Sequence, residues 1–333
     1  MMQTMKLGRT GPTVSALGLG CMGMSPGTYG PADEAESIAT IRAALDAGIN
    51  FIDTGDFYGM GHNEMLIAEA LKGVPRDSYK LSVKFGALRD HAGGWIGNDT
   101  RPAAVKTFLA YTLQRLCVDY IDIYRPARLD PSVPIEETVG AIAECVAAGW
   151  VRHIGLSEVG PETLRRASAV HPISDLQIEY ALTTRNIERA VLPACRELGI
   201  GLTVYGVFGR GLLTGGWQPG KALPGDFRTH APRFQGEAGV RNVAVADDIA
   251  RVAQGFGMSG GQALLSWVLS RGDDVVPLVG ARKPSRVAEA VEAVEQGLRA
   301  GQLSALEAAV PPDAIEGERY APVLMAQLDS ERG

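Results

Sequence analysis

The chain alternates between two patterns of apolar positions. Segments in which apolar residues recur every three or four positions predict amphipathic helices, and the short apolar runs between them predict buried strands. Helices are expected over residues 33–47, 63–72, 101–116, 135–148, 161–169, 187–198, 243–256, 261–271 and 285–296. Strands are expected over residues 17–20, 51–53, 80–84, 120–124, 153–157, 175–179, 201–205 and 274–279.

Eight strands that alternate with helices and show no domain break favour a single (β/α)8 TIM barrel over residues 1–333, rather than an open doubly wound sheet. Before the first strand, Gly11-Pro12 separates two short apolar runs and predicts a short N-terminal β-hairpin cap. After the seventh strand, residues 206–239 are rich in glycine and proline. We expect them to form a long active-site or cofactor loop, and residues 312–333 to form a C-terminal tail.

The first strand runs into a glycine motif. Gly18, Gly20 and Gly23 match the G-x-G-x-x-G spacing of dinucleotide-binding folds, but that motif requires a helix to begin on the glycines. Residues 24–31 contain two prolines and two glycines, which break a helix. The run is therefore interpreted as a first barrel strand that enters an active-site loop.

Composition narrows the classes of function. A net charge of -6 and a pI near 5.5 disfavour nucleic acid or an anionic membrane as the main partner. The sequence has no apolar run near the ~20 residues that a membrane span needs, and its first residues do not resemble a signal peptide, so a cytoplasmic location is expected. The four cysteines form no Cys-x-x-Cys pair, so neither disulfides nor a metal site is expected.

Three polar residues lie at or near neighbouring strand ends. Asp53 ends one predicted strand, Lys84 ends the next, and Tyr58 follows Asp53 by five residues. Active sites of (β/α)8 barrels gather at the C-terminal ends of the strands, so these side chains are expected to meet. Lys84 would then lower the pKa of the Tyr58 phenol from about 10, while Asp53 keeps the lysine charged. Each residue alone is equally typical of a turn, a helix cap or the surface.

The sequence resembles the aldo-keto reductases, which are NADPH-dependent carbonyl reductases built on a (β/α)8 barrel. The resemblance extends from Leu7 to about Leu306 and depends on residues 50–54 with Tyr58-Gly59 and Lys84, and on residues 155–157, 177–180, 209–215 and 276–280. It implies that Tyr58 is the general acid for reduction and the base for oxidation. It also implies that Lys84 tunes this tyrosine and that Asp53 pairs with Lys84.

The same resemblance implies a cofactor site for NADPH. Ser157 and Gln177 would bind the nicotinamide carboxamide, and Tyr205 would stack on the ring. Arg282, Lys283 and Arg286 stand at a predicted helix start, which suits the 2′-phosphate and favours NADPH over NADH, although such cations are also ordinary solvated charges. The further predicted cofactor residues are Gly20, Cys21, Met22, Asp53, Gly206, Gly209, Gly211, Leu213, Gly280 and Glu289.

One position departs from the family pattern. Within residues 124–136, Ala127 occupies the place of the family's catalytic histidine. Either water, Arg125 or Trp95 replaces the missing donor, or the chain is an NADPH-binding redox-sensing or regulatory subunit with weak or no turnover. A third and more distant interpretation keeps only the barrel and makes the protein an isomerase or lyase for a phosphate ligand.

Several apolar residues are expected around the barrel mouth. Met24, Tyr29, Phe57, Trp95 and residues 227–234 predict a substrate pocket for an aromatic or bulky carbonyl compound, with Tyr58, Arg125 and Ala127 also lining it. Loop packing explains the same apolar residues equally well.

Overall fold

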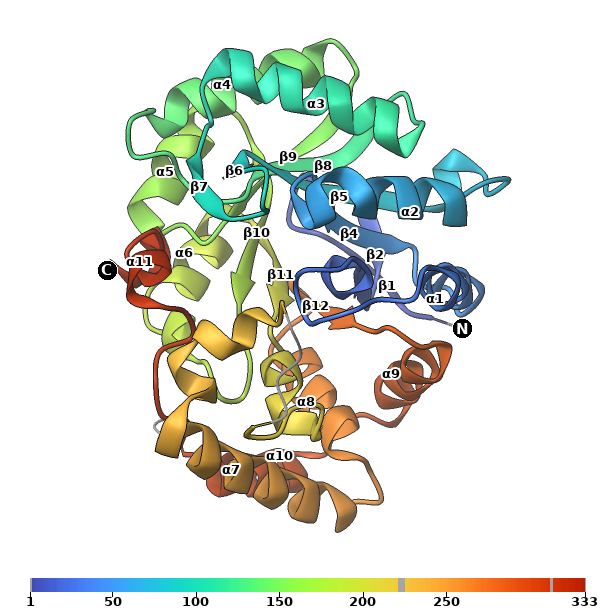
Figure 1. The fold of residues 1–333 in the computed structure, drawn as a ribbon, viewed down its shortest axis with the longest axis vertical. Helices are drawn as coiled ribbons and strands as arrows, with labels where there is room; N and C mark the ends of the chain where they lie inside the picture. The colour runs from blue at the N-terminus through green and yellow to red at the C-terminus, as the bar shows by residue number, and fades with distance from the viewer. Residues whose placement is uncertain (1, 221–224, 312–313, 333) are drawn as a thin grey trace.

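The computed structural model describes residues 2–220, 225–311 and 314–332, and its central feature is a closed barrel of eight parallel strands (Figure 1). Its strands, in chain order, are β3 (Gly18–Gly20), β4 (Phe51–Gly55), β5 (Lys80–Phe85), β8 (Ile121–Pro126), β9 (Val151–Ser157), β10 (Ile173–Glu179), β11 (Gly201–Tyr205) and β12 (Val275–Gly280). Around the barrel they follow this same order, and β12 pairs with β3 to close it. The predicted (β/α)8 architecture is confirmed.

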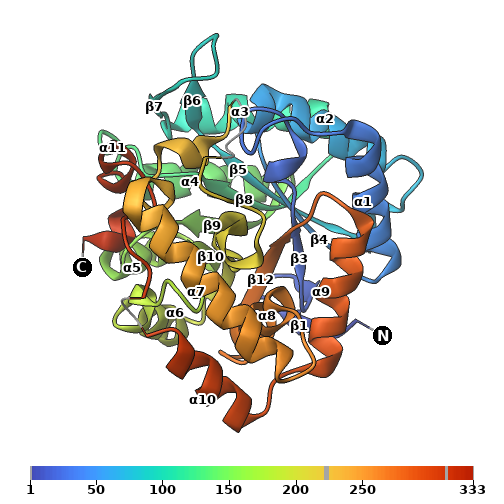
Figure 2. The ribbon, with the colours of Figure 1, turned by 60° about the horizontal axis from the view of Figure 1, so that its bottom comes forward.

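Helices surround the barrel (Figure 2). They are α1 (Glu34–Asp46), α2 (His62–Ala70), α3 (Pro102–Leu116), α4 (Ile135–Ala147), α5 (Pro161–Val170), α6 (Val191–Leu198), α7 (Gly236–Gln254), α8 (Gly260–Leu269) and α9 (Pro284–Gln296). Local signals define their starts: Asp33 caps α1 through its side chain, Ser259 and Gln262 form a capping box on α8, and proline opens α3, α5 and α9.

The N-terminal hairpin is also confirmed, with β1 (Thr4–Lys6) antiparallel to β2 (Thr13–Ser15). Leu7 and Val14 of this hairpin pack on Phe51 and Leu278 in a small core inside the barrel. Between the strands Gly8 has φ +65°, and a Cβ atom there would lie 2.3 Å from the carbonyl oxygen of Ser174. The hairpin therefore closes the N-terminal end of the barrel, and the opposite end carries the candidate site.

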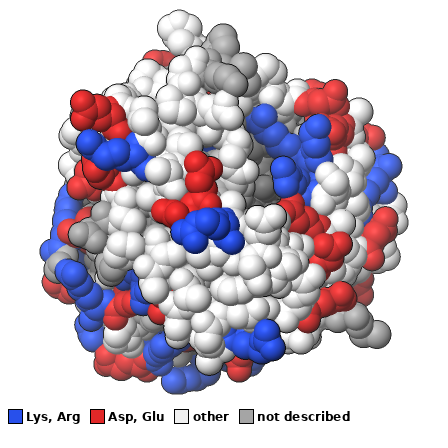
Figure 3. Space-filling view, turned by 90° about the horizontal axis from the view of Figure 1, so that it is seen from below, with Lys and Arg blue, Asp and Glu red and all other residues white. Residues whose placement is uncertain are grey.

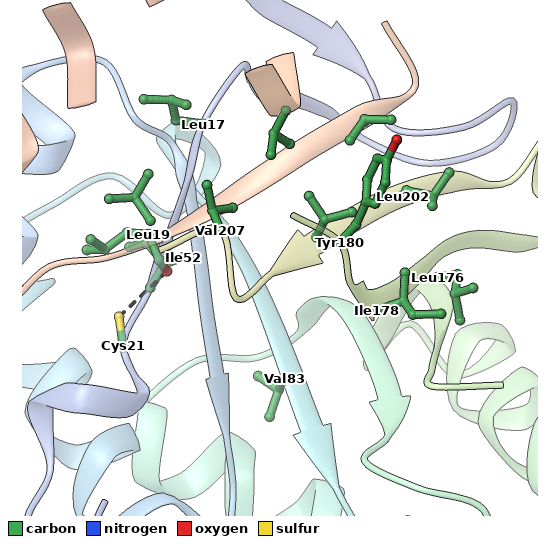
Figure 4. Close-up of a cluster of buried hydrophobic side chains, with 14 of the residues drawn as sticks. Leu17, Leu19, Cys21, Ile52, Val83, Leu176, Ile178, Tyr180, Leu202 and Val207 are labelled. Atoms are coloured by element: carbon green, nitrogen blue, oxygen red, sulfur yellow. Dashed lines mark hydrogen bonds between the residues drawn. The ribbon is translucent and has the colours of Figure 1, made fainter. Parts of the chain in front are cut away.

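Successive side chains of each strand point alternately outward and inward, because a strand is pleated. Leu19, Ile52, Val83, Leu176 and Ile178 point outward into the buried layer beneath the helices (Figure 4). The residues between them, such as Asp53, Ser82 and Gln177, point inward. Buried apolar side chains thus form the wall, and the polar inward residues are left for the barrel interior.

A buried ion pair fills the middle of the barrel. Arg125 lies 2.9 Å from Asp175 and donates a hydrogen bond of 2.8 Å to Ser82. The Thr203 hydroxyl donates to the same oxygen of Asp175, Oδ2, at 2.5 Å. Gly155 provides the space for this ion pair, because a Cβ atom at that position would lie 2.5 Å from Asp175 Oδ1. The expectation that Arg125 lines the substrate pocket is wrong, since its inward position on β8 commits a fully buried guanidinium to the interior.

Three parts of the chain differ from the expectations. A second hairpin, β6 (Ala87–Arg89) with β7 (Trp95–Asn98), follows β5 and stands out at the top of Figure 2. Helix α7 begins at Gly236, inside the expected loop 206–239, of which residues 221–224 lie outside the described residues. The expected tail, of which residues 312, 313 and 333 are likewise not described, contains α11 (Pro322–Met325) and follows α10 (Ala300–Ala309).

Charged side chains of both signs are present on the face of the molecule seen in Figure 3. On the face seen in Figure 3, acidic and basic side chains are interspersed and separated by wide uncharged areas. Within the described part of the chain, no helix combines the length and the apolar character that a membrane span requires.

Candidate active site

Asp53, Lys84 and Gln177 form a buried network at the C-terminal ends of β4, β5 and β10. The Lys84 ammonium donates to Asp53 Oδ1 and, at 2.8 Å, to Gln177 Oε1. Gln177 Nε2 and Ser82 Oγ each donate to Asp53 Oδ2 at 2.7 Å. Every oxygen of the Asp53 carboxylate is thus hydrogen-bonded, so the Lys84 ammonium is held in one position.

Tyr58 lies directly over this network. Its ring centroid is 5.3 Å from Lys84 Nζ, which is cation–π distance, and 4.8 Å from the ring of Phe57. The chain turns sharply after it, because Gly59 and Met60 have left-handed φ values of 56° and 55°. The structure therefore brings the three residues singled out in the sequence together at the barrel mouth.

The pKa of Tyr58 changes in the direction opposite to the one expected. Burial, followed by the negative charge of Asp53, raises it well above its ordinary value of 10.0. Burial also lowers the pKa of Lys84, although Asp53 opposes that change. The expectation considered the lysine charge alone, whereas in the fold desolvation of the phenolate and the nearby carboxylate dominate.

The ends of β9 and β11 carry the residues predicted to hold a nicotinamide. Ser157 is buried beside Gln177 in the strand register, while Tyr205 is only partly buried. The Tyr205 hydroxyl donates to Glu158 at 2.6 Å and lies 3.0 Å from the hydroxyl of Tyr320. Glu158 itself has φ +54°, a strained value for a residue other than glycine.

The C-terminal segment contributes to the site, which the sequence analysis did not foresee. Arg319 is buried and donates to Glu158 at 2.8 Å and to Glu179 at 3.3 Å. Arg319 also pairs with Glu331, at 2.6 Å. The sequence offered no clear signal, because Arg319 follows Glu316 and Glu318 closely, whereas its partners Glu158 and Glu179 are about 140 to 160 residues away.

The loop after β11 lies beside this segment. Gly206, Gly209 and Gly211 all have left-handed φ values (78°, 56° and 88°), so they turn the chain where other residues would be strained. Arg210 pairs with Glu179 at 3.0 Å and lies 4.2 Å from the centre of the Tyr320 ring, while Leu213 is buried.

Three predicted cofactor residues, Gly20, Cys21 and Met22, lie at or just after the end of β3. The amide of Cys21 donates to the carbonyl of Asp53 at 2.9 Å, and burial raises the pKa of its thiol. Met22 begins a short 3-10 helix and is partly buried, as is Gly20 before it. These contacts place the backbone of residues 20–22 next to Asp53.

The predicted phosphate-binding residues divide into two kinds. Arg282 is engaged with the carbonyl oxygens of Gly23, Tyr29 and Pro31 at 2.8 to 3.2 Å. Lys283 and Arg286 are exposed at the start of α9, whose first turn has no side-chain cap. A helix start without a side-chain cap, beside two solvent-facing cations, fits a phosphate dianion.

Two further cofactor predictions lie near this helix. Gly280, at the end of β12, is exposed, and a Cβ there would meet nothing within 4 Å. Glu289 accepts hydrogen bonds from Arg286 at 2.6 Å and from Ser259 at 2.5 Å, so its carboxylate is held beside the helix start.

Ala127 is 2% exposed, and its amide donates to the carbonyl of Phe85 at 2.8 Å. The next residue, Arg128, reaches into the mouth toward Ser157 and Tyr320. Sequence reasoning missed it, although a charged residue two positions after the end of β8 was a usable signal. Neither Ala127 nor Met24, which is fully buried in the core, presents a surface to a substrate, contrary to expectation.

The remaining predicted substrate residues form two aromatic groups. Phe57 and Trp95 have ring centroids 6.3 Å apart, next to Tyr58. Tyr29 packs at 5.3 Å on Phe227, beneath the β11 loop region. Within the described residues, no three His, Cys, Asp or Glu side chains are grouped so that they could hold a metal ion.

A parallel (β/α)8 barrel with a tyrosine, a lysine and an aspartate joined at its strand ends defines a class of barrel oxidoreductases. The model of the Aldo/keto reductase family matches residues 16–311. A relative from Glycine max, described as probable aldo-keto reductase 1, is 41% identical over 320 residues, which cover 96% of this chain and 92% of that protein. The chain therefore belongs to the aldo/keto reductase family, whose members use nicotinamide cofactors.

Solved structures agree with this assignment. A glycerol dehydrogenase from Gluconobacter oxydans has a TM-score of 0.82 at 29% identity, covering 92% of this chain and 94% of that one. An aldo-keto reductase from Bacillus halodurans, solved in a holo form, has a TM-score of 0.76 at 27% identity, covering 94% and 97%.

Proposed function

We propose that the protein is an NADPH-dependent oxidoreductase that interconverts aldehydes or ketones with alcohols. The observation that carries this proposal is the Tyr58 ring held 5.3 Å from the ammonium of Lys84, which Asp53 and Gln177 fix in turn. A phenol beside a fixed cation is suited to transfer a proton to or from a substrate oxygen.

Tyr58 supplies the proton and Lys84 balances the charge that its loss creates. A phenol is protonated at neutral pH even at its ordinary pKa of 10.0, and burial raises the pKa of Tyr58 further, so the side chain holds the proton that it donates. As the proton leaves for the carbonyl oxygen, a phenolate forms next to the Lys84 ammonium, which stabilises it. NADPH, when bound, supplies the hydride that the carbonyl carbon accepts.

The cofactor preference is proposed from the start of α9. Lys283 and Arg286 are exposed cations at a helix start that no side chain caps, an arrangement that fits a 2′-phosphate and therefore NADPH rather than NADH. Ser157 and the Tyr205 ring are the residues proposed for the nicotinamide end. The cytoplasmic location stays a prediction.

The test is a single-turnover experiment in which protein loaded with NADPH is mixed with a panel of carbonyl compounds and the loss of cofactor absorbance is followed. Rapid oxidation that Tyr58→Phe abolishes and Tyr111→Phe leaves intact is the expected result, since Tyr111 is an exposed residue of α3. Full turnover by Tyr58→Phe would refute the mechanism. NADPH that binds tightly but is oxidised by no carbonyl would instead favour the regulatory subunit with weak or no turnover.

A further inference from the structure

Arg128 is a partly buried cation at the barrel mouth without a carboxylate partner. Its guanidinium donates to the neighbouring carbonyl of Ala127 at 2.6 Å. Beyond that it approaches only the hydroxyl groups of Ser157 and Tyr320, each at 3.5 Å. In the part of the chain that the structure describes, it forms no ion pair.

Arg89 is a second such cation near Tyr58. It belongs to the β6–β7 hairpin, where its guanidinium carbon lies 5.7 Å from the centre of the Phe57 ring and 5.0 Å from that of Trp95. Its hydrogen bond is to the carbonyl of Gly93, at 3.3 Å. No carboxylate among the described residues is within ion-pair distance of it.

Several other cations at the barrel mouth do have carboxylate partners. Lys84 pairs with Asp53, Arg210 and Arg233 pair with Glu179, and Arg319 pairs with Glu158. A guanidinium that is removed from water without a counter-ion is costly, and an anion placed beside it relieves that cost. Among the described residues, Arg128 and Arg89 lack a carboxylate partner, and both lie close enough to Tyr58 to interact with it electrostatically.

On the basis of the proposed function, we infer that the substrate is a carbonyl compound that carries a carboxylate, held by Arg128. A guanidinium and a carboxylate form two parallel hydrogen bonds, which fix orientation as well as adding affinity. Arg89 adds positive potential near Tyr58, and the Phe57 and Trp95 rings beside it provide an apolar wall.

The carboxylate takes no part in the reaction itself. Hydride adds to the carbonyl carbon and the Tyr58 proton adds to the oxygen, so the product is the hydroxy acid and the oxidised cofactor. Arg128 orients the substrate by its carboxylate, so that the carbonyl oxygen faces Tyr58.

The test compares 4-carboxybenzaldehyde with benzaldehyde, a pair that differs by one carboxylate. For the wild-type protein, kcat/KM should be about 10- to 100-fold higher for 4-carboxybenzaldehyde than for benzaldehyde. This is the range expected from one charge-assisted hydrogen bond. Arg128→Met should bring the ratio of the two kcat/KM values close to one, because it should lower kcat/KM for 4-carboxybenzaldehyde more than kcat/KM for benzaldehyde, and Arg128→Lys should restore part of the ratio. Arg101→Met is the matched control, because Arg101 is exposed at the same rim and pairs with Asp99.

A binding measurement separates this inference from the proposed function. Calorimetry should detect benzoate but not benzamide with the wild-type protein, and Arg128→Met should lose the benzoate signal. If no carbonyl is reduced yet benzoate binds through Arg128, the anion site stands and the proposed reaction fails. If reduction occurs with equal kcat/KM for both aldehydes, or Arg128→Met slows both equally, the inferred carboxylate site is wrong.

Discussion

Arg319 Nη2 lies 2.8 Å from Glu158 Oε2, so a residue near the end of the chain is paired with one at the end of β9, in the middle of it. Glu158 also accepts from Tyr205, and the guanidinium of Arg319 holds the pKa of its carboxyl at about 2 against the effect of burial. The pair fastens the C-terminal segment across the barrel mouth, next to the residues proposed for the cofactor.

Replacing Arg319 with Met should lower the free energy of unfolding by about 3–5 kcal/mol, because Glu158 and Glu179 are left buried with less compensating charge. Urea denaturation measures the change. The double variant Arg319→Met/Glu158→Gln should recover part of the loss, since the unpaired carboxylate is removed. A single variant as stable as the wild type would mean that the segment is not held by this pair.

Lys84→Met should lower the single-turnover rate by about 10²–10³-fold, because the forming Tyr58 phenolate loses its cation. Affinity for NADPH, measured separately by fluorescence titration, should change much less. The variant Lys84→Met/Asp53→Asn separates stability from catalysis, since it removes the unpaired carboxylate but still lacks the ammonium. Restored turnover in that double variant would argue against the role given to Lys84.

Lys283→Ala and Arg286→Ala should each weaken NADPH binding by about tenfold, as expected for loss of one charge-assisted hydrogen bond, and leave NADH binding unchanged. Arg282→Ala should weaken both cofactors, because this residue ties the loops of Gly23 and Tyr29 to β12. Equilibrium titration with the two cofactors distinguishes the two patterns. Equal losses for NADH in the Lys283 and Arg286 variants would exclude a 2′-phosphate contact.

Asp56 should make the protein less stable as the pH rises. Burial, and then the charge of Glu64, raises the pKa of its carboxyl from 3.8 to about 8, and its Oδ2 atom has no hydrogen-bond partner among the described residues. Between about pH 4 and pH 8 the folded protein keeps a proton that the unfolded chain has released, so stability falls by up to about 1.4 kcal/mol per pH unit and is level above pH 8.

Asp56→Asn should remove this dependence, so its advantage in unfolding free energy over the wild type should grow from pH 5 to pH 8. Asp77→Asn, at an exposed position, is the control and should follow the wild-type pH profile. If the difference in unfolding free energy between Asp56→Asn and the wild type were the same at pH 5 and at pH 8, Asp56 would be ionised in the folded protein at both pH values.

The barrel could be predicted from the sequence because its signals are local. Apolar periodicity, proline at helix starts and Asp33 as a helix cap depend on residues within a few positions of one another. The same holds for Asp53 and Lys84, whose positions at strand ends are visible in the chain. Once a parallel barrel is assumed, strand ends must meet, so their proximity follows from the topology.

It was harder to predict from the sequence which inward-pointing side chains lie in the barrel interior and which lie at its mouth. Arg125 and Lys84 are register neighbours on β8 and β5, yet one belongs to the barrel interior and the other to the mouth. Arg125 is held in the interior by its ion pair with Asp175 on β10, in space that Gly155 leaves open. Both of these residues are far from Arg125 in the sequence.

The sequence alone determined the fold class and the aspartate, tyrosine and lysine at the barrel mouth, because periodicity and strand position are properties of short segments. The tertiary structure decided which charges are paired. Arg319 meets Glu158 across 161 residues, and Arg128 and Arg89 have no carboxylate partner among the residues that the structure describes. Burial then set the direction of the Tyr58 pKa, since desolvation depends on everything packed around a group rather than on its neighbours in the chain.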